Sequence, residues 1–439
     1  MKNNTKNNFV KNPGKLASLF QDIINKKRSP VELLNSFLLR IEEVQEFVEP
    51  WVHLAVENAK RVAQTREQQI MNNTIIGPLH GIPVGIKDII DVKNMPTKFN
   101  SKAFEFNSPS KKDAEIILAL KSAGAIILGK THTTEFAFLD PSPAKNPHNI
   151  NYTPGGSSSG SAAAVACGSI PLSIGTQTMA SVNRPASYCG ISAFKPSNGS
   201  INGFGVSPLA PSFDTVGFYG WSISDAIYGY NSILPNKLKS INHVHNIDNL
   251  NIVFIEDDLL DDIIPEMNGM IQLVLSQMKN SGYCVKKSKS PFSMKKLGDI
   301  QRNIMIYEAG GSLVHLLDYP ADKIGAKLRS AILEGQNMEE EFYISERLKL
   351  NQYRNEFFEH FNKNDIFLWP AAPGAAPKGL SSTGDPKYIS PWTALSGPII
   401  TSNINCFSNE NLPLGFILSS YPGNDNYLSL FANNLGFLN

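Results

Sequence analysis

The feature that most constrains the fold is a helix pattern that leads through one glycine into a run of apolar residues. Residues 114–123, "AEIILALKSA", carry apolar side chains at helical spacing, and Gly124 stands where such a helix would end. The residues that follow it, 125–128, "AIIL", are typical of a buried strand. Because helices that alternate with buried strands build α/β proteins, the sequence predicts an α/β fold.

The same alternation recurs along the chain. Ser29, Pro30 and Glu32 form a capping box with proline at the first helical position, which predicts a helix over residues 30–43. Further helices are predicted over the following residues: 51–69 and 162–166. Buried strands are predicted within 80–92, over 170–174 and 250–255, and from 365 onward.

The predicted elements indicate one domain over residues 1–439. We expect residues 1–25 to be an N-terminal extension that is partly flexible. Residues 258–362 turn strongly charged and mainly helical, which predicts a helical insertion or subdomain.

Composition narrows the class of partner. The chain has 439 residues, 42% of them hydrophobic, so it can bury a large core. Its formal net charge of +1 gives no basic footprint for nucleic acid, and no run of about 18 apolar residues predicts a membrane span. The four cysteines lie far apart with no metal-type or disulfide-type spacing, so we expect a reducing, cytoplasmic compartment.

Three local patterns suggest chemistry that their context does not support. Residues 124–131, "GAIILGKT", match the phosphate-binding loop pattern, but "AIIL" is itself a predicted strand and a helix precedes it. His243 and His245 have the spacing of a metal pair on a strand, but no third ligand is evident, so we expect no metal site. No histidine or asparagine arrangement singles out Cys189 as a nucleophile, which favours a buried structural thiol.

The stretch "GGSSSGS", residues 155–161, has three interpretations. A flexible linker is disfavoured because an alanine-rich helix and a buried strand follow at once. A glycine-rich loop that opens a helix could bind an anion, but this one lacks the lysine of a nucleotide loop. The third interpretation is catalytic, since a serine can act as nucleophile when a neighbouring base takes its proton.

The catalytic interpretation needs a second serine and a lysine that can lose its charge, and the sequence has a candidate for each. Lys87 lies in the apolar, glycine-lined "GIPVGIKD", where desolvation would lower the pKa of a lysine. Ser181 lies in "GTQTMASVNRP", whose successive backbone N–H groups could face a developing oxyanion.

Taken together, these segments resemble the amidase signature family of serine hydrolases. "GPLHGIPVGIKD" is similar to its lysine motif, "TPGGSSSGSAAAVA" to its glycine-serine motif, and "GTQTMASVNRPASYCGISAFKPS" to its nucleophile motif. Ser157 and Ser181 are 24 residues apart, as that family places its two serines. Flanking segments such as "GKTHTTEFA" and "LPLGFILSSYPGND" extend the resemblance over nearly the whole chain.

The resemblance implies a fold and a set of catalytic roles. The implied fold is a single α/β domain with a large twisted mixed sheet flanked by helices. Ser181 would be the nucleophile and Lys87 the base, while Ser157 would follow a cis peptide bond and relay the proton between them. The implied reaction acylates Ser181 with loss of amine or ammonia and then hydrolyses the ester, with no metal or organic cofactor.

The resemblance also implies an oxyanion hole made of main-chain N–H groups. The residues expected to supply them are Thr178, Met179, Ala180 and Ser181. We further expect Ser158 and Gln177 to bind substrate.

The sequence departs from the family pattern beside the nucleophile, where residues 177–180 read Gln-Thr-Met-Ala in place of Asp-Thr-Gly-Gly, and two of the departures bear on function. Met179 stands where the commonest family text has glycine, and a side chain there would narrow the acyl pocket. Asn183 replaces the usual arginine, with Arg184 one place later. These two changes keep open a catalytically weak relative that binds a ligand or partner.

The leading hypothesis is an amidase that acts on a small-molecule amide, and the resemblance suggests a homodimer. The alternative of a glutaminase-type subunit of a tRNA-dependent amidotransferase ranks lower. Those subunits carry an acidic residue, which holds the amino group of glutamine, in a region where this chain has residues 387–397, "KYISPWTALSG". This stretch contains no acid.

Overall fold

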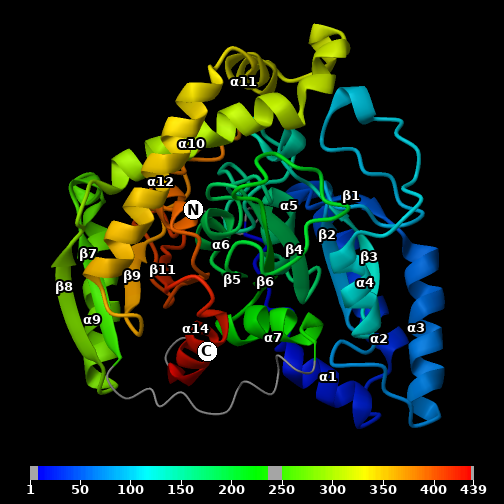
Figure 1. Cartoon of the computed structure of the whole chain (residues 1–439). Coiled ribbons are helices and arrows are strands. Elements are labelled where there is room, and N and C mark those ends of the chain that lie inside the picture. The colour runs from blue at the N-terminus through cyan, green and yellow to red at the C-terminus, as the bar shows by residue number, and fades with distance from the viewer. Residues whose placement is uncertain (1–7, 236–249, 437–439) are drawn as a thin grey trace, which may run out of the picture.

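One mixed sheet of 11 strands runs through the structure, in the order β1-β3-β2-β4-β6-β5-β10-β11-β9-β7-β8 (Figure 1). The computed structural model describes residues 8–235 and 250–436. The strands are β1 Trp51–Leu54, β2 Pro83–Lys87, β3 Ile126–Thr131, β4 Leu172–Gln177, β5 Ser192–Lys195, β6 Thr215–Gly220, β7 Asn251–Glu256, β8 Cys284–Lys289, β9 Ile366–Pro370, β10 Ile399–Ser402 and β11 Phe416–Ser419.

Parallel pairing is confined to two parts of this sheet. Strand β2 is parallel to both β3 and β4, and β7 is parallel to both β8 and β9. The strands between these groups pair antiparallel, as do β1 and β3. The structure is therefore a single mixed α/β domain, as the sequence predicted.

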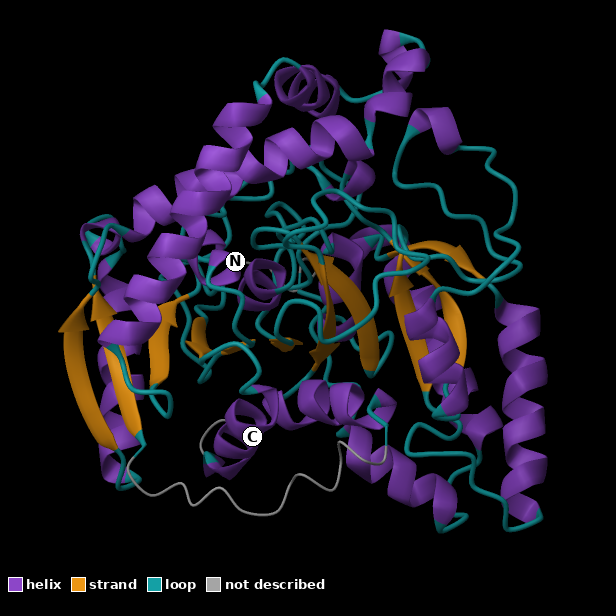
Figure 2. Ribbon diagram, viewed as in Figure 1, coloured by secondary structure: helices purple, strands orange, loops and turns teal. Residues whose placement is uncertain are grey.

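Helices cover both faces of the sheet. In the view of Figure 2 the strands form a band with helices above and below it. The α-helices are α1 Leu16–Ile24, α2 Pro30–Val48, α3 Val56–Met71, α4 Glu115–Ser122, α5 Ser159–Ala166, α6 Asn183–Cys189, α7 Ile223–Ile233, α9 Pro265–Asn280, α10 Met294–Ser312, α11 Ala326–Gln336, α12 Glu340–His360, α13 Ser390–Ala394 and α14 Asp425–Asn434. Short 3₁₀ helices are η1 Lys102–Phe104, η2 Glu135–Ala137, η4 Asp258–Leu260, η5 Val314–Asp318 and η6 Ala321–Lys323.

Alternation along the strands sends neighbouring side chains to different cores. In β3, Ile127 packs with α1, α4 and α7, whereas Ile126 and Leu128 pack with α2, α3 and α5. In β9, Leu368 joins the first of these cores, and Phe367 joins a third core with α10, α12 and α13. The central strands are therefore covered on both faces, which explains their apolar sequences.

Most predicted elements are present, with two corrections. The predicted helix over 51–69 is wrong at its start, because Trp51–Leu54 is strand β1, which pairs with the end of β3, and helix α3 begins only at Val56. The helical region over 258–362 also contains a strand, β8, which pairs with β7 at the edge of the sheet.

Two sequence expectations concern absences. Within the described parts of the chain, no helix is long and apolar enough to cross a membrane. His243 and His245 lie outside the described residues.

Candidate active site

The end of β2 brings Lys87 to Ser157, in the loop before α5, although 70 residues separate them in the chain. Lys87 is the last residue of β2, and its Nζ donates to Ser157 Oγ at 2.7 Å. The same Nζ donates to Thr176 Oγ1 at 2.7 Å and to the Thr176 carbonyl at 3.4 Å. Lys87 therefore contacts neutral oxygen atoms and no carboxylate among the described residues.

Burial shifts the protonation equilibrium of Lys87 toward the neutral amine. Its side chain is completely buried, and this desolvation holds the pKa of Lys87 well below the ordinary lysine value. The charge of Asp214 acts on the same pKa in the opposite direction and only partly offsets the burial. Burial therefore favours the neutral amine, which has a lone pair available to accept a proton.

Ser157 is held by the glycines before it. Gly155 has a φ of +83°, a conformation that favours glycine, and the Gly156–Ser157 peptide bond is cis. A Cβ on Gly156 would lie 2.6 Å from Thr383 Cγ2, so only glycine fits there without displacement of its neighbour. The Arg184 guanidinium donates to the Gly156 carbonyl at 2.8 Å and fixes this turn from the other side.

Ser181 lies between the end of β4 and the start of α6. Ser181 is 9% exposed, and its side chain makes no hydrogen bond to any residue in the described part of the chain. The Ser181 carbonyl accepts from the Ser158 N–H at 3.3 Å and from the Tyr219 hydroxyl at 3.0 Å. The backbone of Ser181 is thus tied to the loop of Ser157, while its hydroxyl is left free to face a cavity.

The loop over residues 178–181 turns its carbonyl groups toward the protein. Gln301 Nε2 donates to the Thr178 carbonyl at 2.7 Å, and Thr393 Oγ1 donates to the Met179 carbonyl at 2.6 Å. The Ala180 carbonyl accepts from the N–H of Arg184 at 3.0 Å. By contrast, the N–H groups of residues 178–181 donate to no described residue, so they are available to a ligand.

Gln177 ties this loop to the helix behind it. Its Oε1 accepts from the N–H of Val182 at 2.8 Å and of Asn183 at 3.0 Å, which caps the start of α6. Its Nε2 donates to Asn183 Oδ1 at 2.8 Å and to Thr393 Oγ1 at 2.9 Å. The Gln177 side chain is fully buried, so the structure does not bring it to the cavity.

Ser158 is also turned inward. Its Oγ donates to the Thr176 carbonyl at 3.1 Å and accepts from the Thr176 N–H at 3.2 Å. Like Gln177, it is fully buried and lines no part of the cavity beside Ser181. The structure therefore places these two predicted substrate contacts in the support of β4 and the loop after it.

A cavity of about 170 Å³ opens beside Ser181. Thr178, Met179, Ala180 and Ser181 all line it, so the residues that carry the unpaired N–H groups and the unpaired hydroxyl border the same hollow. The remaining lining residues are Ala137, Phe138, Leu139, Arg184, Leu209, Arg302, Met305, Ile306 and Pro386. A molecule in this cavity could contact Ser181 and the 178–181 backbone together.

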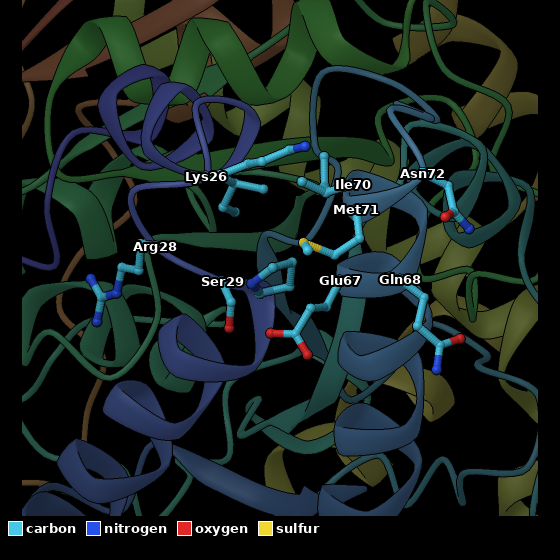
Figure 3. Close-up of a pocket in the computed structure, with 10 residues that line it drawn as sticks. Lys26, Arg28, Ser29, Glu67, Gln68, Ile70, Met71 and Asn72 are labelled. Atoms are coloured by element: carbon cyan, nitrogen blue, oxygen red, sulfur yellow. The ribbon is translucent and has the colours of Figure 1, made fainter.

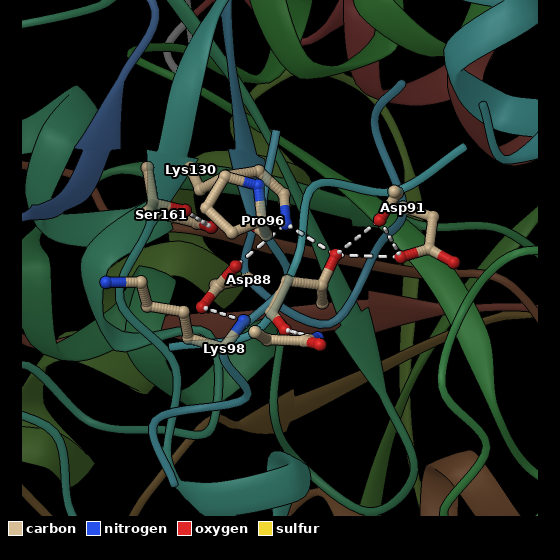
Figure 4. A network of polar contacts seen from close by, with 10 residues as sticks. Asp88, Asp91, Pro96, Lys98, Lys130 and Ser161 are labelled. Carbon is tan, nitrogen blue, oxygen red and sulfur yellow. Dashed lines mark hydrogen bonds and ion pairs between the residues drawn. The ribbon is translucent and has the colours of Figure 1, made fainter. Parts of the chain in front are cut away.

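A buried ion pair joins Lys130 to Asp88, the residue that follows Lys87 in the chain (Figure 4). Lys130 Nζ donates to Asp88 Oδ1 at 2.7 Å and to Thr97 Oγ1 at 3.2 Å, and Asp88 Oδ2 accepts from the Lys98 N–H at 3.0 Å. Burial raises the pKa of Asp88 and lowers the pKa of Lys130, and the contact between their charges opposes both shifts. Because Asp88 follows Lys87 in sequence, Lys130 neutralises the carboxylate nearest to the end of β2.

Other hollows lack this combination of groups. A hollow of about 560 Å³, lined by Lys26, Arg28, Glu67 and Met71 among others, lies between the α1–α2 turn and the end of α3 (Figure 3). A cavity of about 600 Å³ adjoins the one beside Ser181 and is lined by Thr176, but not by Ser181. The described residues contain no group of three or more histidine, cysteine, aspartate or glutamate side chains that could hold a metal ion.

The remaining sequence candidates are structural. Residues 126–131 form strand β3, so the phosphate-loop match has no loop to wrap a phosphate. Cys189 is fully buried, and burial raises the pKa of its thiol well above the ordinary value, which disfavours a thiolate nucleophile.

Sequence reasoning missed the residues that hold the site from a distance. Thr176 lies within the quoted nucleophile segment and could have been singled out as a polar residue at a strand end. Gln301 and Thr393 come from α10 and α13, 123 and 214 residues away from their partners, and no local pattern marks them. Asp214 accepts from Thr178 Oγ1 at 2.5 Å, and burial raises the pKa of this carboxyl to about 6.

Comparisons with known proteins bear on this arrangement. The amidase family model matches residues 32–428. A glutamyl-tRNA(Gln) amidotransferase subunit of Sulfurihydrogenibium sp. (strain YO3AOP1) is 27% identical over 456 residues, which cover 93% of this chain and 93% of that protein. The protein of the same name from Gloeothece citriformis (strain PCC 7424) is 28% identical over 453 residues, which cover 92% of this chain and 93% of that protein.

Solved structures share the fold at low sequence identity. A chain from a vestigial protein complex, solved in a study of the origins of an s-triazine catabolic enzyme, has a TM-score of 0.88 at 22% identity over 96% of this chain and 98% of that one. The 6-aminohexanoate cyclic dimer hydrolase has a TM-score of 0.86 at 17% identity and covers 97% of both chains. Because the family model matches most of the chain, the protein belongs to the amidase signature family and is a hydrolase of C–N bonds.

Proposed function

We propose that the protein hydrolyses a small carboxamide through an acyl intermediate on Ser181. The observation that carries this proposal is the 2.7 Å contact between the fully buried amine of Lys87 and Ser157 Oγ, one loop away from a free serine hydroxyl in a cavity. A buried, neutral lysine is suited to act as a general base.

The proposed acylation moves one proton through two hydroxyl groups. The neutral Lys87 amine accepts the proton of Ser157 Oγ, and Ser157 Oγ accepts the proton of Ser181 Oγ as the latter attacks the carboxamide carbon. When the tetrahedral intermediate collapses, the C–N bond breaks and the proton returns through Ser157 to the leaving nitrogen. Water then attacks the acyl ester with the same groups, which releases the acid and restores Ser181.

The negative charge that develops on the carboxamide oxygen would be stabilised by the loop over residues 178–181. The N–H groups of this loop donate to no described residue. Its carbonyls are held in place by the side chains of Gln301 and Thr393 and by the backbone N–H of Arg184. An arrangement fixed before the reaction stabilises a transition state without reorganisation, and one such donor contributes about 10²- to 10³-fold in kcat. We assign the oxyanion hole to Thr178, Met179, Ala180 and Ser181.

Ser158 and Gln177 are proposed to position the site. Ser158 supports Thr176, which shares the Lys87 amine with Ser157, and Gln177 fixes the turn after Ser181. Both act through other residues, so neither needs to touch substrate.

A second candidate function is the glutaminase-type subunit of an amidotransferase. It is favoured by the name of the relatives described above, which match over more than nine-tenths of this chain. It is disfavoured because no acidic residue occurs in residues 387–397 and none lines the cavity beside Ser181 in the described structure. We therefore place hydrolysis of a small amide first.

The proposal is tested by labelling with a fluorophosphonate probe and by a panel of amides and esters. The expected result is stoichiometric labelling of the intact protein and none of Ser181→Ala, with ammonia released from at least one amide. Absence of both labelling and hydrolysis in the folded protein would instead support a relative that binds a ligand without turnover. Glutamine belongs to the panel because preferential release of its amide nitrogen would favour the amidotransferase function.

A further inference from the structure

We propose that the cavity beside Ser181 selects an uncharged, apolar acyl group of about six carbon atoms, and that Met179 determines the size of this group. This inference rests on the proposed function, because it takes Ser181 as the atom that carries the acyl group. It adds the substrate class, which the family membership and the names of the relatives leave undefined.

The walls of the cavity are apolar and come from distant parts of the chain. The large apolar side chains that line it are Phe138, Leu139, Met179, Leu209, Met305 and Ile306. Most of them pack into the core that α10 and α13 form over the sheet, so the walls are fixed by tertiary contacts. Burial of a hydrocarbon group against such walls is favourable, whereas a charged group would lose its hydration there.

The two cations at the cavity differ in how their charges are compensated. Arg184 is buried and donates to the carbonyls of Gly156 and Gly384, at 2.8 and 2.7 Å. Arg302 is about half exposed and donates to both carboxylate oxygens of Glu334, at 3.0 and 3.1 Å. The charge of Arg302 is therefore compensated at the surface. Arg184 has only neutral acceptors, which include Thr383 Oγ1 at 3.1 Å, and its Nε has no hydrogen-bond partner among the described residues, so Arg184 is the one of the two cations whose charge no described carboxylate pairs.

No group in the cavity would hold the ammonium of an amino acid amide. None of its described lining residues is acidic. The buried carboxylate of Asp214 is close in sequence to Leu209, but it accepts from Thr178 Oγ1 and from the N–H groups of Leu209 and Ala210, and it lines the adjoining cavity instead. Glutamine would thus leave its ammonium group without a partner and place its carboxylate against mainly apolar walls.

The volume limits the size of the group. At about 170 Å³ the cavity is slightly larger than apolar protein cavities of about 150 Å³ that bind benzene. A phenyl ring or a five- to six-carbon alkyl chain fills this space. Shorter chains would leave part of the apolar wall uncovered, and longer chains would extend beyond the space that these apolar walls enclose.

Met179 is the wall residue that belongs to the catalytic loop itself. Its carbonyl is held by Thr393, so the backbone is fixed, and its partly buried side chain packs against the core while it lines the cavity. Because this side chain lines the same cavity as Ser181 and comes two residues before it in sequence, truncation would enlarge the cavity at the reacting end. Met305 lines the same cavity from α10 and offers a second, independent wall.

The test compares primary amides by the rate of ammonia release, with Ser181→Ala as the blank. The series is acetamide, butyramide, hexanamide, decanamide and benzamide, with glutamine and adipic acid monoamide as charged compounds of similar length. We expect kcat/KM to rise about fourfold per added methylene up to hexanamide, to fall for decanamide, and to be at least about tenfold lower for each charged compound than for hexanamide.

Variants then assign the size limit. Met179→Ala should move the optimum to longer chains and raise the decanamide to hexanamide ratio of kcat/KM at least about tenfold, and Met305→Ala should move it in the same direction. The matched control is Met71→Ala, a methionine that is 64% exposed on α3, which should leave the ratio unchanged.

The outcomes separate the two proposals. Preference for glutamine or for adipic acid monoamide, with Ser181 still labelled by the probe, would overturn the apolar selectivity and leave the proposed Ser181 chemistry unaffected. If Arg302→Gln then lost the preference for the monoamide, Arg302 would be identified as its cause. An unchanged chain-length ratio in both methionine variants would overturn the role of Met179. Failure of the probe to label Ser181, together with no hydrolysis, would overturn the proposed function itself.

Discussion

At the scale of single residues, Lys87 and Gln177 show how burial gives common side chains particular properties. Lys87 is surrounded by hydroxyl and carbonyl oxygens rather than carboxylates, so burial lowers its pKa without a compensating ion pair. The buried amide of Gln177 makes four hydrogen bonds to other residues of the protein, two through Nε2 and two through Oε1. The two residues can be tested separately, because Lys87 is proposed to accept a proton during the reaction and Gln177 to hold the backbone turn after Ser181.

The lowered pKa of Lys87 predicts the pH dependence of the reaction. Only the neutral amine can accept a proton, so kcat/KM should rise with pH through the pKa of Lys87 and then remain level. The midpoint should lie well below the ordinary lysine value of about 10.4. A pH–rate profile measures this directly.

Substitution of the lysine completes this test. Lys87→Met should lower kcat/KM about 10²- to 10⁴-fold and abolish the rise with pH, whereas Lys296→Met, at an exposed position, should change neither. A profile that keeps its midpoint in Lys87→Met would assign the titration to another group.

Loss of the Gln177 side chain should disturb stability and catalysis together. Gln177→Leu leaves the buried N–H groups of Val182 and Asn183 without an acceptor, at a cost of about 3 kcal/mol in the free energy of unfolding. Urea unfolding measures this loss, and Gln68→Leu on the exposed side of α3 is the control. If KM changes and kcat does not, Gln177 contacts substrate rather than positions the loop.

At the scale of elements, the end of strand β2 is fixed by the pair of Asp88 and Lys130. Lys130 comes from β3, which is parallel to β2, so their pairing brings the two side chains together. Since both are buried, their contribution is to the placement of Lys87 and to charge balance rather than to net stability.

Breaking this pair should cost more than removing it. Lys130→Met leaves an unpaired buried carboxylate and should lower the free energy of unfolding by about 3 to 5 kcal/mol. The double variant Asp88→Asn with Lys130→Met should recover at least half of that loss, because no buried charge then remains. Chemical denaturation of the single and double variants measures both, and equal losses would mean that the lysine contributes by packing rather than by charge.

At the scale of the whole molecule, burial differs widely between the centre and the edge of the sheet. Cys167 and Cys189 are buried around α5 and α6, whereas Cys284 is exposed on the edge strand β8, and Cys406 is intermediate. The four thiols therefore report on different depths of one domain.

Thiol labelling should follow this order. A maleimide or an aromatic disulfide reagent should modify Cys284 at once and Cys406 more slowly, while Cys167 and Cys189 should react only as fast as the protein opens. Cys284→Ser should remove the fast phase alone. Rapid reaction of all four thiols in the native protein would show that the helices behind the serines open readily.

Elements with local signals could be predicted from the sequence. The capping box of Ser29 with Glu32 is a short sequence pattern, as is the glycine after α4, and both corresponding helices are present. Strand β8, "CVKKSK", could not be predicted, because an edge strand needs few apolar residues. The sequence predicts helix where β1 lies, because the pairing of β1 with β3 is a long-range contact that leaves no local pattern.

The sequence by itself determined the alternation of helices and strands and, through resemblance, the choice of Lys87, Ser157 and Ser181, since these are local motifs. Only the tertiary structure decided the order of the sheet, the 2.7 Å contact between Lys87 and Ser157, and the apolar walls beside Ser181. The physical reason is that burial, pKa and cavity shape depend on residues that meet across long stretches of the chain, such as Gln301 with Thr178, 123 positions apart. Such long-range contacts leave no local sequence pattern.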